Sequence, residues 1–273
     1  MTKNKLAIGA VIAALIGGSL IAQPAKAASN DLVIGSVLDI DKTDPHTATN
    51  FATVRALGLV YGSLIEIGAK NAIKGGLATS WIFSKDGTQL TLNLREGVKF
   101  HDGSAFDAED AKASLERILD TKTGAAARAN IATIQTITAK GRQLVLKMSV
   151  PNAPILAALE GVNMAMLSKE DIVAGKIGGA NKPNGTGPFK WGSWEPTQSV
   201  KLSSFADYYM GEPKIKNVTI RVIPNEASIL SAMNSGAVQF GIVTDPLIAK
   251  QVGKNLKTYR VPALAYYALQ LNN

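Results

Sequence analysis

The sequence has no cysteine and only two histidines in 273 residues. Without cysteine, a disulfide framework and a thiolate metal site are excluded. A lipid-anchored exported protein is also excluded, because that class needs a cysteine directly after its cleavage site and Ala28 stands there. The two histidines, His46 and His101, lie about 55 positions apart in predicted turns, so the chain offers little for acid–base catalysis.

Long apolar runs are absent except at the N-terminus. Two lysines precede an uncharged apolar stretch of 17 residues, 6–22, and Ala25-Lys26-Ala27 then supplies a small-x-small pattern. This arrangement predicts a cleaved signal peptide over residues 1–27 and a mature chain that begins near Ala28. The alternative is a permanent membrane anchor, which the short length of the stretch disfavours. We therefore expect a periplasmic protein.

An excess of basic residues is present but modest. The chain has 29 Lys and Arg against 21 Asp and Glu, and three of the lysines lie in the predicted signal peptide. The densest basic group has neither an arginine-rich run nor interleaved aromatics, so a solvated basic face is favoured over a nucleic-acid partner. This group consists of Lys250, Lys254, Lys257 and Arg260.

Helical and strand patterns alternate along the chain, which predicts an α/β fold. Leu32 to Ile34 form a short apolar strand, and apolar residues at helical spacing predict a helix over 53–67. After Pro183 the residue composition of the sequence changes. An alternating strand at 218–222, a helix from Asn225 and a strand at 238–243 then predict a β-α-β unit with parallel pairing and a right-handed crossover.

Two hairpins are predicted between these segments. Asp86-Gly87 separates an apolar run from a strand of period 2, and Lys140-Gly141 separates a second pair of strands. Asp107 is placed to cap a helix between the hairpins. His101-Asp102-Gly103 predicts a tight turn in which Asp102 bonds nearby backbone and Gly103 adopts a positive φ.

Motifs of catalysis and cofactor binding are absent. The sequence has no Gly-x-Ser-x-Gly elbow, no His-Glu-x-x-His pair, no phosphate-binding loop and no Gly-x-Gly-x-x-Gly after a strand. Gly185-Thr186-Gly187 is too short for a dinucleotide fingerprint, and Pro188 after it lacks the N–H that a phosphate would bind. The sequence thus predicts a protein that is not an enzyme and has no cofactor.

Three carboxylates, Asp39, Asp41 and Asp44, follow the first strand. They lack the sixth-position glycine and twelfth-position glutamate of a calcium loop, so we expect a solvated acidic loop and no metal. Binding of a cationic group of an organic ligand stays open. The tryptophans at 81, 191 and 194 have two interpretations, core packing or an aromatic wall around a ligand, and the first is favoured for Trp81.

An ordered series of motifs in this sequence resembles the motifs of a known family. Residues 81–110 contain Trp-Ile-Phe-Ser-Lys-Asp-Gly, Leu-Arg-Glu-Gly-Val-Lys-Phe-His-Asp-Gly and Ala-Phe-Asp-Ala-Glu-Asp, and three further passages agree. The series resembles the family 5 extracytoplasmic solute-binding proteins, the dipeptide, oligopeptide and nickel-binding components of ABC importers. There are two departures, Gln239 in place of a common Asp and Gly62-Ser63 in place of Glu-Gly. The three passages are 38–46, 185–189 and 205–213.

The resemblance implies the fold and its division along the chain. It implies an α/β lobe like that of periplasmic binding proteins of type II, cluster C, with a mixed sheet and a hairpin-rich subdomain. Family members are about twice as long, so we expect an N-terminal portion with the second lobe missing. We expect a first segment of the lobe at 28–65, the hairpin-rich subdomain at 66–182 and a second segment of the lobe at 183–273.

The resemblance also implies a function, which is capture of a small solute without chemistry and its delivery to an ABC permease. The ligand is expected to be a di- or oligopeptide, bound one to one by a monomer. Nickel chelates, haem, oligosaccharides and opines are also carried in this family and are not separated from peptides. An envelope chaperone or docking protein and a secreted hydrolase remain as alternatives. The ligand-contacting residues that the resemblance implies are Leu38, Asp39, Ile40, Tyr266 and Tyr267.

Overall fold

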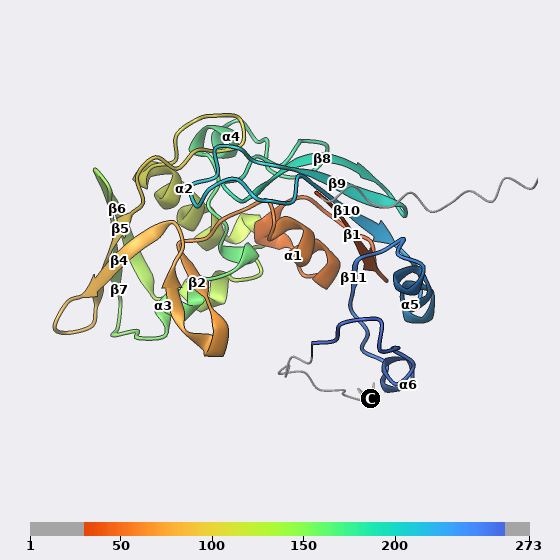
Figure 1. Cartoon of the computed structure of the whole chain (residues 1–273). Helices are drawn as coiled ribbons and strands as arrows, with labels where there is room; N and C mark the ends of the chain where they lie inside the picture. The colour runs from red at the N-terminus through yellow and green to blue at the C-terminus, as the bar shows by residue number, and fades with distance from the viewer. Residues whose placement is uncertain (1–29, 260–273) are drawn as a thin grey trace, which may run out of the picture.

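A five-stranded mixed sheet forms one side of the protein in Figure 1, in a computed structural model that describes residues 30–259. The strand order is β11-β1-β10-β9-β8. β1 runs parallel to both of its neighbours, whereas β9 is antiparallel to β10 and β8. In chain order the strands are β1 (Asp31–Ser36), β8 (Phe189–Glu195), β9 (Ser199–Ser204), β10 (Asn217–Val222) and β11 (Phe240–Gly241).

Helices cover both faces of this sheet. On one face α1 (Phe51–Leu57) contributes Ala56 and Leu57 to a core that includes Ile220 and Trp191. On the other face α5 (Glu226–Asn234) lies so close to Gly35 that an added Cβ would be 3.2 Å from Cγ2 of Ile229. Glycine at this position therefore allows the helix to rest on the strand.

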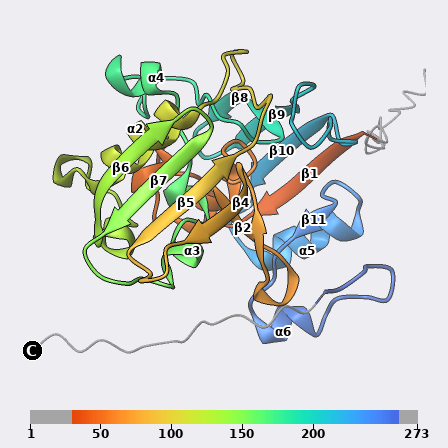
Figure 2. The ribbon, with the colours of Figure 1, turned by 90° about the vertical axis from the view of Figure 1, so that its left-hand side faces the viewer.

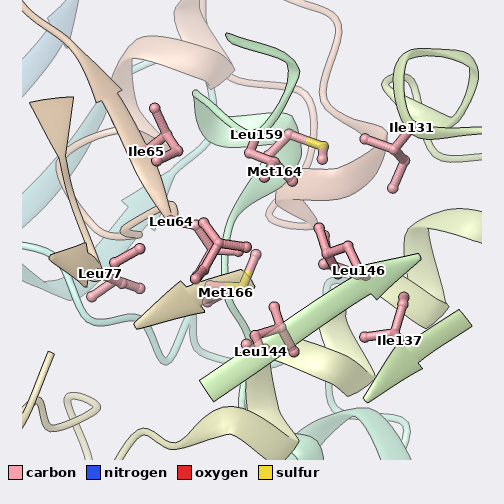
Figure 3. Packing of buried hydrophobic residues seen from close by; sticks show 14 of the residues in the cluster. Leu64, Ile65, Leu77, Ile131, Ile137, Leu144, Leu146, Leu159, Met164 and Met166 are labelled. Atoms are coloured by element: carbon pink, nitrogen blue, oxygen red, sulfur yellow. The ribbon is translucent and has the colours of Figure 1, made fainter. Parts of the chain in front are cut away.

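A second sheet of four antiparallel strands, ordered β4-β5-β7-β6, forms the hairpin-rich part of the protein (Figure 2). One face is solvated, and α2 (Ala108–Leu119) packs against the other. The leucines that alternate along β5 and β7 are almost fully buried, and in Figure 3 Leu144 and Leu146 lie among Leu64, Met164 and Met166. The strands are β4 (Ala78–Phe83), β5 (Gln89–Leu94), β6 (Ile134–Lys140) and β7 (Gln143–Met148).

Shorter elements lie between the strands of the two sheets along the chain or, in the case of α6, follow them. β2 (Ile65–Ile67) pairs with β3 (Ile73–Gly75) in a separate antiparallel ribbon. The short helices are α3 (Ile155–Ala158), α4 (Lys169–Val173) and α6 (Pro246–Ala249).

Local signals predicted both hairpins and their helix correctly. Gly87 has φ 68° and Gly141 has φ 58°, as the two turns require. The Asp107 side chain accepts hydrogen bonds from the amides of Glu109 and Asp110, and the Asp110 side chain accepts one from the amide of Asp107, which completes a capping box. These elements form where the sequence placed them because every signal is local.

Two expectations were wrong. The helix predicted over 53–67 ends at Leu57, and Ile65–Ile67 is a strand. Val60 and Leu64 are buried, but Val60 lies in the core under the five-stranded sheet and Leu64 in the core of the hairpins, so their helical spacing is coincidental. The strands β10 and β11 are parallel but do not pair directly, because β1 lies between them.

No helix within residues 30–259 has the length and apolar character needed to cross a membrane. The predicted signal peptide lies outside the described residues.

Candidate functional site

The connections between strands of the five-stranded sheet diverge at β1. The chain leaves β10, passes through α5 and returns as β11 on the other side of β1, so the carboxyl ends of three parallel strands meet at one edge of the sheet. Ligands of open α/β sheets bind outside such carboxyl ends, where the strand connections diverge. The loop after β1 therefore lies where a ligand is expected.

Apolar side chains and unpaired amides are exposed at this edge. Leu38 is 53% exposed and Val37 37%, while Phe240 on β11 is 49% and Ile242 after it is 37%. Within residues 30–259 the N–H groups of Val37 and Leu38 donate no hydrogen bond. We call these four residues the β1 edge. It combines apolar contact area with donors that can pair with an extended backbone.

Asp39 holds the loop in place. Its Oδ2 accepts from the Thr197 amide at 2.7 Å and from the Trp194 indole N–H at 3.1 Å, and its Oδ1 accepts from the Ile40 amide at 2.8 Å. Thr197 has φ 61°, which is unusual for a residue other than glycine, and the hydrogen bond that its amide donates to Asp39 helps to stabilise that turn. A ligand amine at Asp39 would add to a carboxylate that already has three protein donors.

The other predicted ligand contacts divide into exposed, buried and undescribed positions. The side chain of Leu38 is exposed, whereas Ile40 is 5% exposed and packs in the core beside α1. Tyr266 and Tyr267 lie outside the described residues. Contact of all five with a ligand stays a prediction.

The tryptophans favour core packing in the described part of the chain. Trp81 packs against the hairpin core, and Trp191 is 5% exposed in the core under the five-stranded sheet. Trp194 is partly buried, and its indole N–H donates a hydrogen bond to Asp39.

The expected solvated acidic loop is corrected only in part, because the Asp41 side chain is 42% exposed whereas Asp44 is mostly buried. Asp41 accepts a 2.6 Å hydrogen bond from the Thr53 hydroxyl. Asp44 forms an ion pair with Arg117, and the two side chains are 15% and 17% exposed. The three carboxylates thus turn to different partners, and residues 30–259 contain no cluster of three or more potential metal ligands from His, Cys, Asp and Glu.

Arg117 also fixes His46, an arrangement that sequence patterns did not indicate. Its Nη1 donates to His46 Nδ1 at 2.8 Å, and His46 Nε2 donates to the Ala165 carbonyl at 2.9 Å. This geometry requires the neutral ring. Burial lowers the pKa of His46 to about 4, and the Arg117 charge adds to that effect against the opposing influence of the Ala165 carbonyl.

His101 joins two of the sequence motifs. Its Nε2 donates to the Gly187 carbonyl at 3.0 Å, its Nδ1 accepts from the Gly185 amide at 3.3 Å, and its own amide donates to the Gly185 carbonyl at 2.9 Å. Burial lowers the pKa of His101 to about 4. The turn after it is as predicted, with Gly103 at φ 95° and Asp102 accepting from the Ser104 amide at 2.9 Å.

The two buried histidines predict a loss of stability in mild acid. Both have a folded pKa below the ordinary 6.5, so the unfolded chain binds more protons and stability falls as the pH drops below 6.5. Between pH 7 and 5 we expect each histidine to cost ~2 kcal/mol of unfolding free energy, measured by urea denaturation. The variant His46→Gln should lose about half of this pH dependence. An unfolding free energy that is flat between pH 7 and 5 would contradict the assignment.

Gln239 ties β11 to β1. Its Oε1 accepts from the Val33 amide at 2.8 Å, and its Nε2 donates to the Gly236 carbonyl at 2.8 Å. An aspartate, which has no N–H donor, cannot make the second bond. The departure from the family pattern therefore replaces a charge by a neutral bridge between strands.

A separate cavity of about 350 Å³ lies between the His101 turn, the loop around residues 176–184 and β8. Leu38, Asp39 and Ile40 do not line it. We place the candidate site at the β1 edge because the strand topology and the unpaired amides both indicate it.

Comparison with known proteins identifies the class. The family model for bacterial extracellular solute-binding proteins, family 5 (middle region) matches residues 72–273. The chain belongs to this family, which confirms the resemblance carried by the motifs.

Relatives in the family are about twice as long as this chain. The glutathione-binding protein GsiB of Escherichia coli (strain K12) is 28% identical over 252 residues, which cover 90% of this chain and 49% of GsiB. GsiB of Salmonella paratyphi A is 29% identical, with coverage of 94% and 51%. The chain spans about half the length of the curated relatives that it matches.

Solved structures confirm the periplasmic-binding-protein fold. MoaA of A. tumefaciens R10, in complex with mannopinic acid, has a TM-score of 0.76 and 27% identity over 82% of this chain and 47% of its own. The oligopeptide-binding protein AppA of Bacillus subtilis, in complex with a nonapeptide, has a TM-score of 0.75 and 25% identity over 82% and 46%. DppA of Helicobacter pylori, with the peptide STSA, has a TM-score of 0.73 and 27% identity over 81% and 48%.

Proposed function

We propose that the chain is the part of an ABC importer's solute-binding component that contacts the captured solute through its β1 edge. The observation that carries this proposal is the pair of unpaired amides beside the exposed Leu38, at the point where three parallel strands end. Membership of the solute-binding family supports the general role.

Short peptides are the proposed ligand class. An extended peptide backbone offers carbonyl oxygens to the amides of Val37 and Leu38, and Leu38 offers apolar contact that does not depend on one side-chain type. Relatives and structural neighbours are named for glutathione, a nonapeptide and the peptide STSA. Mannopinic acid in MoaA shows that one neighbour takes an opine.

We further propose that the protein binds its solute without catalysis and acts in the periplasm. It does so as a monomer that docks on a membrane permease. The ring nitrogens of both histidines form hydrogen bonds with structural partners, which suits a protein without acid–base chemistry. We retain the division into segments at 28–65, 66–182 and 183–273 as part of this proposal, with residues 1–27 as the export signal. The two hydrophobic cores support it, since one lies in the hairpin part and the other under the five-stranded sheet.

Truncation of Leu38 tests the role of the β1 edge. We expect Leu38→Ala to weaken binding of glutathione or a tripeptide about 5- to 10-fold, because ~1 kcal/mol of apolar contact is lost. Affinity is measured by NMR titration of the full chain. The control Val173→Ala, on α4 with 81% exposure, should leave the affinity unchanged. Equal affinity of the Leu38 variant and the parent would remove Leu38 from the site.

A further inference from the structure

The cavity beside the His101 turn has a composition unlike that of the β1 edge. Its volume is about 350 Å³, within the range of small-molecule sites. Three lysines, Lys176, Lys182 and Lys190, line it together with Tyr61 and Trp191. A liquid water molecule occupies about 30 Å³, so the cavity has room for a molecule much larger than water.

The negative charges that line the cavity are already engaged. The Asn184 amide nitrogen donates to Asp171 Oδ2 at 2.8 Å and to Asp102 Oδ2 at 3.0 Å, and the Ser104 hydroxyl donates to Asp102 at 2.6 Å. By contrast, the three lysines have no carboxylate within 4.0 Å among residues 30–259. The cavity thus has an excess of one positive charge, carried by groups without an ionic partner in that range.

Two neutral groups add hydrogen-bonding capacity. Burial raises the pKa of the Tyr61 phenol, and the negative charges of Asp44 and Asp171 raise it further, so Tyr61 keeps its proton. Trp191 is 5% exposed as a whole residue, and its indole N–H is paired with no acceptor within residues 30–259. The indole nitrogen is not one of the fully buried polar atoms that lack a partner, so it keeps contact with solvent and can donate to an acceptor bound in the cavity.

We propose that this cavity is a second binding site, for a small organic carboxylate. The lysines attract the carboxylate, and the Trp191 N–H and the Tyr61 O–H can donate to its oxygens. Trp191, Ile177 and Pro183 provide an apolar wall for the body of the ligand, which favours an organic anion over inorganic phosphate. The site is independent of the solute site at the β1 edge.

Benzoate and benzamide form a matched pair of probes, because they share a shape and differ in charge. We expect benzoate to shift the Trp191 indole N–H resonance of the full chain in NMR titrations, and benzamide to bind at least 10-fold more weakly. The Trp191 signal is assigned with Trp191→Phe. Inorganic phosphate serves as a third probe, and phosphate binding as tight as that of benzoate would overturn the assignment to an organic ligand.

Lysine variants locate the binding. The double variant Lys182→Gln and Lys190→Gln should weaken benzoate at least 10-fold, while Lys201→Gln, whose parent lysine pairs with Glu195 on the surface, should have no effect. Thermal unfolding of both proteins checks that they fold. Leu38→Ala should bind benzoate like the parent. A failure of the carboxylate-site proposal can therefore be distinguished from a failure of the solute-site proposal at the β1 edge. No shift of the Trp191 resonance, equal binding of benzamide, or undiminished binding by the double variant would overturn the proposal.

Discussion

Replacement of Gly185 by alanine is expected to destabilise the protein by more than ~3 kcal/mol. A Cβ at this position would meet the Val60 carbonyl oxygen at less than contact distance and would lie 2.9 Å from the Tyr61 ring. Neighbouring hydrogen bonds hold the two backbone segments at this separation. The Gly185 carbonyl accepts from the His101 amide at 2.9 Å, and the Gly187 amide donates to the Val60 carbonyl at 2.8 Å. The melting temperature should fall by about 6–12 °C, or the variant should fail to fold.

The control for this variant is Gly211→Ala. Gly211 has φ 93° and no atom within 4 Å of an added Cβ, so alanine there adds only backbone strain of ~1–2 kcal/mol. Calorimetry of both variants separates the clash from the strain. If Gly185→Ala unfolds at or above the melting temperature of Gly211→Ala, the close approach of the two backbone segments does not limit stability.

Replacement of Arg117 by alanine has the second large expected effect, a loss of ~3–5 kcal/mol. The side chain joins α2 to the loop after β1, and its removal leaves the mostly buried Asp44 carboxylate without its cation. His46 Nδ1 loses its donor as well. The comparison is Lys201→Ala, which breaks the exposed pair with Glu195 and should cost no more than ~1 kcal/mol.

The same variant tests the cause of the His46 pKa. The Arg117 charge is one of the factors that lower this pKa, so in Arg117→Ala the pKa should rise and the protonated ring can pair with Asp44. Stability should then fall less steeply between pH 6.5 and 5 than in the parent, as measured by urea denaturation. A cost below ~1 kcal/mol with an unchanged pH profile would show that the cluster is not important for the fold.

Much of the fold was predictable because its signals are short. Strands such as β5 and β7 alternate buried leucines with more exposed residues next to a turn glycine, and Asp107 caps α2 within three residues. Residues 58–67 were mistaken for helix because apolar spacing does not reveal that two different cores meet there.

The site was only partly predictable, because its contacts are long-range. The family resemblance predicted ligand contacts at residues 38–40, and these contacts stay a prediction. The partners of Asp39 are 155 and 158 residues away in the chain, and Arg117 lies 73 residues from Asp44. No periodicity or local motif indicates such pairs, so Asp39 and Asp44 were expected in solvent or at a ligand.

The most direct test of the central claim is a ¹⁵N–¹H NMR titration of the full chain with glutathione and with trialanine. If the β1 edge contacts the solute, the amide resonances of Val37 and Leu38 shift progressively as either ligand rises to about 10 mM, while that of Val173 stays fixed. Shifts confined to other parts of the protein, or none for either peptide, would contradict the account.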